Sequence, residues 1–78
     1  MSIIENLTTT KDCAIYKVKV LYHMRILRRN KRQPDPRAET VKKILISLGS
    51  EAAMTRALRD VIRGDETLDH MIARYTGV

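Results

Sequence analysis

Residues 15–26 read IYKVKVLYHMRI, and the spacing of apolar side chains in this stretch decides the fold class that we predict. Apolar residues occupy every second position, namely Tyr16, Val18, Val20, Tyr22, Met24 and Ile26. The positions between them are mostly basic, namely Lys17, Lys19, His23 and Arg25. An alternation of period two, built from β-branched and aromatic side chains, is typical of a half-buried strand. The sequence therefore predicts a strand over about 15–26.

A helix is the alternative for the same stretch. Thr9 and Asp12 have the spacing of a helix capping box, and neither glycine nor proline interrupts residues 1–33. A strand would also need a neighbour, either residues 2–8 folded back as a hairpin or the same strand of a second chain. The sequence leaves these possibilities open.

Three short amphipathic helices are predicted after residue 35, the first over about 36–48. The residues that begin them are Asp35 with Pro36, then Ser50, then Asp65 or Thr67, and the residues that end them are Gly49, Gly64 and Gly77. Apolar residues recur at helical spacing in each, namely Val41, Ile44, Leu45 and Leu48, then Met54, Ala57, Leu58, Val61 and Ile62, then Leu68, Met71, Ile72 and Tyr75. The fold class predicted is α+β, a basic N-terminal strand or hairpin followed by three helices, with an all-α arrangement of four helices as the alternative.

The length and composition indicate one small domain with a thin core. The 78 residues contain no Phe or Trp and a single cysteine, Cys13, so neither large aromatic side chains nor a disulfide within the chain can stabilise the core. We therefore expect a homodimer. The lone thiol and an N-terminus without a signal-peptide pattern predict a cytoplasmic protein, and no apolar run is long enough to span a membrane.

Positive charge is concentrated in one window. The chain has a net charge of +6, and residues 25–37 contribute most of it. The basic residues of this window are Arg25, Arg28, Arg29, Lys31, Arg32 and Arg37, against the single acid Asp35. Residues 27–35 would form a basic linker between the strand and the helices within a single domain over 1–78. Such a window predicts contact with a polyanion, since neutralised phosphates release condensed counterions, or else a merely solvated linker.

The second predicted helix and the strand offer further basic groups. Arg56, Arg59 and Arg63 share the polar face of the helix, which follows the turn at Gly49 in the order of a helix-turn-helix unit. Alternatively, Arg56 pairs with Asp60, and Arg59 pairs with Asp60 or Glu51, on a solvated face. One face of the strand would present Lys17, Lys19, His23 and Arg25, as in a ribbon that enters the major groove.

A basic strand followed by two helices resembles the order of elements in ribbon-helix-helix repressors. The resemblance covers residues 15–63 and is architectural, because the connection over 30–36 is longer than in that family and the turn at Gly49 is tighter. It implies a dimer whose paired strands contact the groove, but no family membership follows from it.

No catalytic, metal-binding or cofactor motif accompanies these features. Cys13, His23 and His70 stand in unrelated segments, and none has the spacing of a nucleophile with its base or of a metal-ligand pair. We therefore expect a non-enzyme without cofactor. The favoured function is a small nucleic-acid-binding protein, a dimeric DNA-binding transcriptional regulator, with DNA favoured over RNA. The alternative is an inhibitor or adaptor of phage or plasmid type that docks on an acidic patch of a larger host protein.

Overall fold

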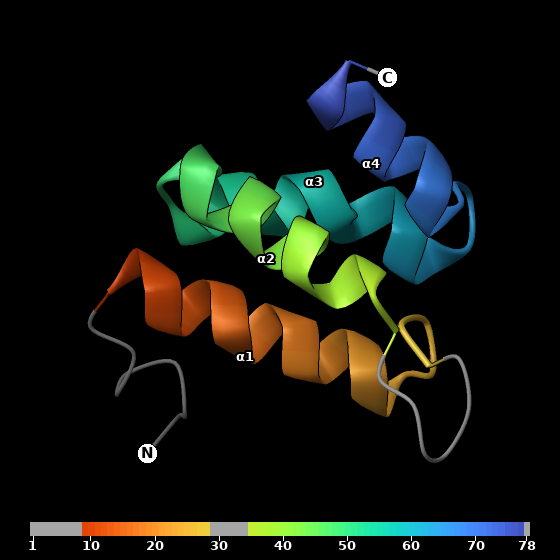
Figure 1. The fold of residues 1–78 in the computed structure, drawn as a ribbon, viewed down its shortest axis with the longest axis horizontal. Coiled ribbons are helices and arrows are strands. Elements are labelled where there is room, and N and C mark those ends of the chain that lie inside the picture. Colours follow the sequence, from red (N-terminus) through yellow and green to blue (C-terminus); the bar gives the residue numbers. More distant parts are fainter. Residues whose placement is uncertain (1–8, 29–34, 78) are drawn as a thin grey trace.

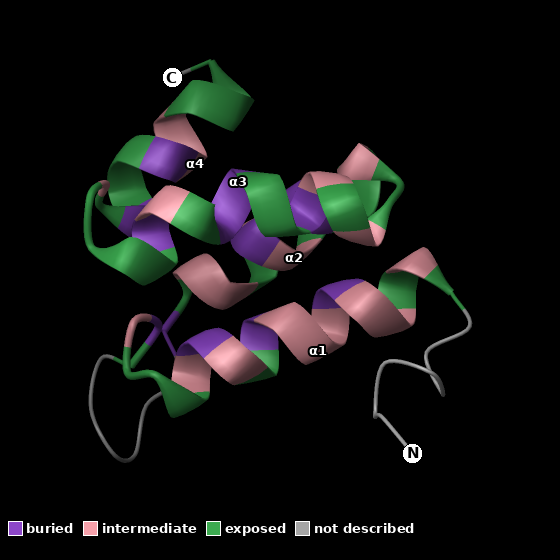
Figure 2. Cartoon of the chain, turned by 180° about the vertical axis from the view of Figure 1, so that it is seen from behind, coloured by how far each residue is buried: buried purple, intermediate pink, exposed green. Residues whose placement is uncertain are grey.

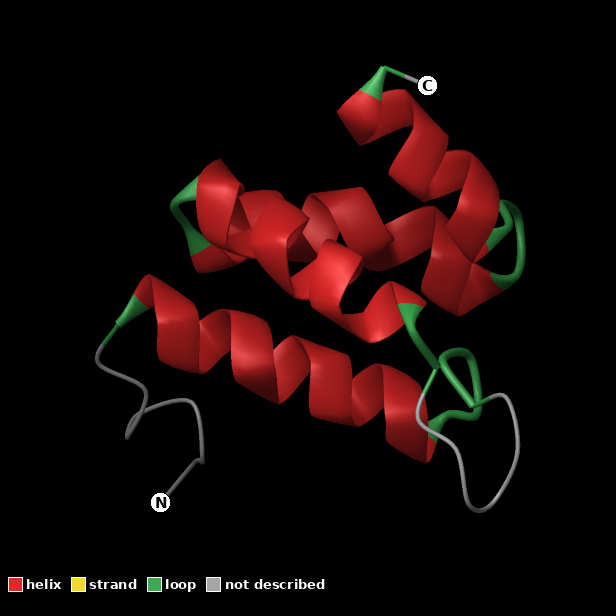
Figure 3. Cartoon of the chain, in the orientation of Figure 1, coloured by secondary structure: helices red, strands yellow, loops and turns green. Residues whose placement is uncertain are grey.

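The computed structural model describes residues 9–28 and 35–77. These ranges contain four helices and no strand, and the helix bounds are α1 Thr10–His23, α2 Arg37–Leu48, α3 Glu51–Arg63 and α4 Leu68–Thr76 (Figure 1, Figure 3). The strand predicted over 15–26 is therefore wrong, together with the ribbon it would have formed, and the all-α alternative is confirmed. None of the helices in the described ranges is long and apolar enough to cross a membrane.

The stretch over 15–26 is mostly helical because the apolar residues that it buries have helical spacing and not the spacing of a strand. Ala14, Val18 and Leu21 are buried and stand at i, i+4 and i+7. Leu21 is fully buried although it lies among the positions between the alternating apolar residues, whereas Met24, one of the alternating set, is 42% exposed. A helix also satisfies its backbone hydrogen bonds internally, while a strand here would have required a partner strand.

Thr9 caps α1, since its Oγ1 accepts a hydrogen bond from the Asp12 amide at 3.0 Å, as the helical alternative requires.

The connection between α1 and α2 is packed into the core at both of its ends. After α1, Leu27 is fully buried, and Asp35 is 3% exposed. Both ends of the predicted linker over 27–35 are thus packed, and residues 29–34 lie outside the described ranges.

The predicted signals for the later helices hold with small changes. α2 begins one residue later than predicted, with Pro36 at the N-cap position in place of Asp35 and Arg37 as the first helical residue. The Asp35 Oδ1 still accepts a hydrogen bond from the Arg37 amide at 2.9 Å. Side-chain caps begin α3 at Ser50 and α4 at Thr67, which decides between Asp65 and Thr67. Gly49, Gly64 and Gly77 all adopt left-handed backbone angles where their helices end.

The first three helices run in alternating directions, with α2 opposite to α1 and α3 (Figure 1). α1 packs on both α2 and α3, and α4 packs on the same two helices on the side remote from α1. The buried faces meet between the helices (Figure 2), where the largest fully buried side chains are Leu21, Leu27, Val41, Leu45, Met54, Leu58 and Met71. Two residues of the predicted apolar stripes, Ile62 and Tyr75, are instead 38% and 42% exposed.

Candidate nucleic-acid interface

The outer face of α3 presents the three arginines that the helical spacing brings together. Arg56, Arg59 and Arg63 are exposed and stand at i, i+3 and i+7. The opposite face of the helix is buried through Met54, Ala57, Leu58 and Val61. The hydrogen bond from the Ala53 amide to the Ser50 hydroxyl, at 3.2 Å, begins the helix one turn before Arg56. The arginines are therefore fixed on a packed element.

Little of the positive charge on this face is neutralised locally. The Arg59 Nε lies 3.6 Å from the Asp60 Oδ1, and the Arg59 side chain is 59% exposed. Arg56 and Arg63 form no ion pair within residues 9–28 and 35–77. The predicted pairing of Arg56 with Asp60 is thus not formed, because Asp60 contacts Arg59 instead. Two guanidinium groups on this face have no carboxylate partner in the described protein.

The two lysines of the predicted strand do not share a face. The Lys17 Nζ donates a hydrogen bond to the Thr55 Oγ1 at 2.9 Å and lies 3.7 Å from the Glu51 Oε1, so this lysine links α1 to the first turns of α3. Its side chain is only 16% exposed. Lys19 is exposed, and two positions along a helix turn it about 200° away from Lys17. The helix separates what a strand would have aligned.

Arg25 and Arg28 lie beyond the end of α1, and both are exposed. Arg25 adopts a left-handed backbone angle, φ 66°, and it is the one non-glycine residue with a positive φ in the described ranges. The other predicted members of this basic group, Arg29, Lys31 and Arg32, lie outside the described residues.

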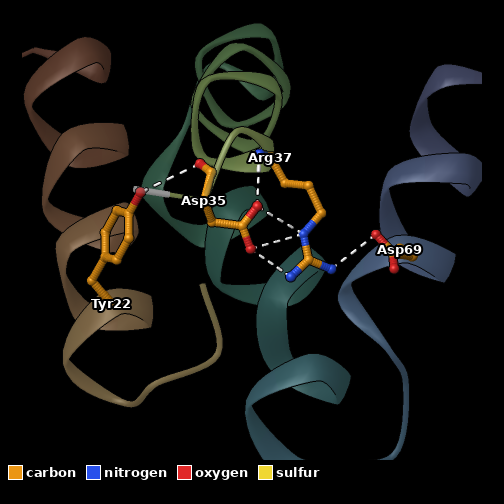
Figure 4. A network of polar contacts seen from close by, with 4 residues as sticks. All are labelled: Tyr22, Asp35, Arg37 and Asp69. Carbon is orange, nitrogen blue, oxygen red and sulfur yellow. Dashed lines mark hydrogen bonds and ion pairs between the residues drawn. The ribbon is translucent and has the colours of Figure 1, made fainter. Parts of the chain in front are cut away.

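Arg37 has partners within the protein and anchors a polar network (Figure 4). Its Nε lies 3.0 Å and 2.9 Å from the two carboxylate oxygens of Asp35, and its Nη2 also donates to Asp35 Oδ2. On the other side, Arg37 Nη1 donates to Asp69 Oδ1 at 2.9 Å. The hydrogen bonds to Asp35 and then to Asp69 raise the pKa of Arg37 above its ordinary value, so the guanidinium stays charged.

This network connects three separated parts of the chain. Asp35 and Arg37 stand at the start of α2, Asp69 is in the first turn of α4, and the Tyr22 hydroxyl near the end of α1 donates to the Asp35 carbonyl oxygen at 3.4 Å. The planar guanidinium fork suits bidentate contact with a carboxylate, and Asp35 supplies it from a nearly buried position. The geometry gives Arg37 a role in joining α2 to α4.

Most acidic side chains in the described ranges are held in ion pairs. The paired carboxylates belong to Asp35, Glu39, Glu51, Asp60, Glu66 and Asp69. The basic side chains that form no ion pair in the same ranges are Lys11, Lys19, Arg25, Arg28, Lys43, Arg56 and Arg63. Of the carboxylates in these ranges, those of Asp12 and Asp65 alone form no ion pair, against seven exposed basic side chains without one, so the excess charge on the described surface is positive.

Sequence reasoning missed the network around Arg37 and the unusual backbone at Arg25. The order Asp-Pro-Arg over 35–37 offered a partial signal, because a capping aspartate two residues before an arginine can also accept from its guanidinium. The contact with Asp69, 32 positions further along, had no local signal. Nothing in the sequence indicated a left-handed backbone conformation at Arg25, since arginine has no preference for that conformation.

The described ranges show no candidate metal site. These residues contain no group of three or more His, Cys, Asp or Glu side chains placed to hold a metal ion. Cys13 is a free thiol, partly buried against the core. No family model, curated protein or solved structure matches the chain. The candidate interface therefore rests on the geometry and charge of the chain itself.

Proposed function

We propose that this protein binds nucleic acid, double-stranded DNA in preference to RNA, through the outer face of α3 and the basic residues after α1. The observation that carries the proposal is the excess of exposed basic side chains over carboxylates, which includes Arg56 and Arg63 on one face of α3, both without an ion-pair partner in the described ranges. An arginine without an internal partner is free to bind a phosphate or the edge of a guanine bidentately. The proposal involves binding alone and assigns no catalytic residue.

The shape of α3 supports contact with a duplex. Arg56, Arg59 and Arg63 extend over about 10 Å of helix axis, and an α-helix fits the major groove of DNA. α2 precedes α3 through the two-residue link Gly49 and Ser50 and runs in the opposite direction, so the pair is an αα-hairpin that supports α3 from behind (Figure 1). In this proposal α3 reads or tracks the groove, in the role of the helix that we predicted for recognition.

The other basic residues of the predicted interface fall into two groups, those that would contact phosphates and those that have partners within the protein. Arg28 and Arg25, with Arg29, Lys31 and Arg32 of the same basic window, would contact phosphates, and Lys19 could join them from α1. Lys17 and Arg37 serve packing in this proposal, because their charges are directed at Glu51, Asp35 and Asp69. Phosphate contacts position a protein on DNA but carry no sequence information, so the target sequence depends on α3.

Duplex DNA is preferred to single-stranded RNA because the aromatic side chains are poorly placed for stacking. Recognition of single strands relies on aromatic rings that are open to unpaired bases. Tyr16 and Tyr22 are only partly exposed, and the Tyr22 hydroxyl is directed at Asp35. Tyr75 is 42% exposed, but the Arg74 guanidinium lies over its ring at 5.1 Å from the centroid. The described surface offers charge rather than a stacking platform.

The test is fluorescence anisotropy with labelled duplex DNA, and with single-stranded RNA for comparison, over a salt series of about 50–300 mM. Arg56→Gln with Arg63→Gln should weaken duplex binding and lower the salt slope by about 2, because each lost phosphate contact removes about 0.9 from it. The matched control is Lys11→Gln with Lys43→Gln, which removes two exposed charges that also lack ion pairs. Equal losses of duplex affinity in the two double variants would mean that binding depends on net charge and not on the outer face of α3.

A second candidate is an acidic protein partner, as for an inhibitor or adaptor. The observation that favours it is Ile62, which is 38% exposed on α3 beside Arg59 and Arg63. An apolar side chain within a basic face suits a protein surface with acidic and apolar groups better than it suits phosphates. Ile62→Ser should leave duplex affinity within about twofold if DNA is the ligand. A large loss of duplex binding in this variant would count against a purely electrostatic DNA contact.

We also propose that the protein forms a homodimer. In the described ranges the large apolar side chains that remain exposed are Met24, Ile46, Ile62 and Tyr75. A small core gains most from covering such groups in a second copy. Light scattering coupled to gel filtration measures the mass directly, and a monomer at micromolar concentration would remove the dimer from the proposal while leaving the α3 contact intact.

A further inference from the structure

The end of α1 is a Schellman turn with an arginine at its left-handed position. The Arg25 amide donates to the Tyr22 carbonyl oxygen at 3.0 Å, and the Ile26 amide donates to the Leu21 carbonyl oxygen at 2.9 Å. These two bonds have the pattern of the Schellman motif, in which the residue after the C-cap has a positive φ. Arg25 supplies it with φ 66°. The turn also directs Leu27 into the core, where it is fully buried.

The other three helices end differently. Gly49, Gly64 and Gly77 occupy the left-handed positions after α2, α3 and α4, with φ of 80°, 84° and 75°. Glycine adopts this conformation without strain, whereas a side chain with a Cβ is disfavoured there. Asparagine and aspartate tolerate it better than other residues because they can hydrogen-bond locally, and arginine lacks that ability. The chain therefore gives up stability at this one helix end.

No side-chain contact in the described ranges offsets the disadvantage at Arg25. Its side chain is exposed and forms no hydrogen bond or ion pair in the described ranges. A cation near a helix C-terminus is favoured by the helix dipole, but an arginine at the preceding positions His23 or Met24 would gain the same benefit without a positive φ. The dipole thus explains a basic residue near this end and leaves the left-handed arginine unexplained.

We propose that Arg25 is a preorganised contact for a phosphodiester group, retained at the cost of a weaker helix stop. The inference rests on the proposed nucleic-acid binding and adds a specific anchor to it. The Schellman hydrogen bonds and the buried Leu27 hold the Arg25 backbone rigidly at the end of α1. A guanidinium that starts from a fixed backbone loses less conformational entropy on binding than one on an unfixed segment. Unlike Arg37, it has no carboxylate partner within residues 9–28 and 35–77 to exchange for phosphate.

The experiment combines a stability measurement with a binding measurement on the full chain. Arg25→Gly should raise the melting temperature by about 4 °C, since glycine relieves the left-handed strain. The same variant should bind a labelled DNA duplex about eightfold more weakly at 0.1 M salt, with a salt slope lower by about 0.9. Arg25→Lys keeps the charge and the strain, so its melting temperature and salt slope should stay close to those of the unaltered protein. Lys43→Gln is the matched control for loss of one exposed charge.

Each outcome decides a different statement. Arg25→Gly with greater stability and weaker duplex binding than Lys43→Gln would establish the exchange of stability for contact. Arg25→Gly that binds as well as Lys43→Gln would overturn the anchor and leave the proposed function standing. Arg25→Gly without a gain in melting temperature would also overturn it, because no stability would then be given up. An unaltered protein that fails to bind duplex DNA at 0.1 M salt would overturn the proposed function and the anchor together.

Discussion

Asp35→Ala tests whether a nearly buried carboxylate connects α2 to the rest of the fold. The Asp35 side chain is 3% exposed, accepts from the Arg37 amide at 2.9 Å, and receives the Arg37 guanidinium on both oxygens. Asp69 binds the same guanidinium, but its side chain is 75% exposed. The two carboxylates thus share a partner and differ in burial, which makes Asp69→Ala a matched control.

The magnitude follows from the contacts that each variant removes. Loss of the acceptor for the Arg37 amide costs about 1 kcal/mol, as for other helix caps. Loss of the charge-assisted pair with Asp35 costs about another 1–2 kcal/mol, at the low end of its range because Arg37 is 36% exposed and water can solvate it. Asp35→Ala should therefore lower the free energy of unfolding by about 2–3 kcal/mol. Asp69→Ala removes a surface ion pair and should cost about 0.5 kcal/mol or less.

Urea denaturation followed by circular dichroism measures both changes. A domain of this size has a total stability of about 4–12 kcal/mol, so the loss in Asp35→Ala is a large fraction of it. With a slope near 1 kcal/mol per molar urea, the midpoint should fall by about 2–3 M. Asp35→Asn retains an acceptor for the amide and should lie between the unaltered protein and Asp35→Ala. Similar midpoints for Asp35→Ala and Asp69→Ala would refute the argument that burial decides the value of these pairs.

Arg37 itself adds no pH dependence to this stability near neutrality. Its pKa is raised in the folded protein by the hydrogen bonds to Asp35 and then Asp69. A raised pKa contributes stability that is fully present below the pKa of the unfolded state and is lost only as the pH rises through the folded value. Both values lie far above neutral pH for an arginine, so its share of the stability stays constant between about pH 6 and pH 9.

Two further substitutions test the packing and the helix stops. Leu27→Ala should lower the free energy of unfolding by about 2–4 kcal/mol although Leu27 lies outside every helix, because its side chain is fully buried; urea midpoints measure the loss, and a change below about 1 kcal/mol would contradict the placement of this segment in the core. Gly64→Ala should lower the free energy of unfolding by about 1 kcal/mol. The cost comes from the positive φ of 84° alone, because the space that an added Cβ would enter is open. A melting temperature equal to that of the unaltered protein would show that the helix can end elsewhere.

The predicted features that held are those decided within a few residues. Ser50 caps α3 through the amide three positions later, and Gly49 and Gly64 end their helices through the conformation of a single residue. Such signals are present in the sequence because the interacting groups are neighbours along the chain. The bounds of the last three helices were accordingly predicted to within about one residue at the ends that glycine closes.

The strand prediction failed because helix or strand at 15–26 depends on distant contacts. The inner face of α1 is narrow, and Ala14 on it is too small to stand out in a hydrophobic pattern. That face is covered by α2 and α3, and even the polar contact of α1 with α3 joins Lys17 to Thr55, 38 positions away. The exposure of Ile62 has a related cause, since this residue continues the apolar spacing of α3 but lies at the margin of the buried face. Periodicity reports which residues share a face and does not report how much of that face is covered.

The same dependence on distant contacts explains why the positive charge on the outer face of α3 could not be predicted from the net charge of its segment. Residues 38–78 contain equal numbers of basic and acidic side chains, so their net charge is zero. In the fold, however, Asp69 pairs with Arg37 and Glu51 pairs with Lys17, both from outside that segment. Exposed charges act over about 8–10 Å at physiological salt, so pairing within that distance matters more than the segment total. The outer face of α3 carries three arginines and one nearby carboxylate, Asp60, so it is positive although the segment that contains it is neutral.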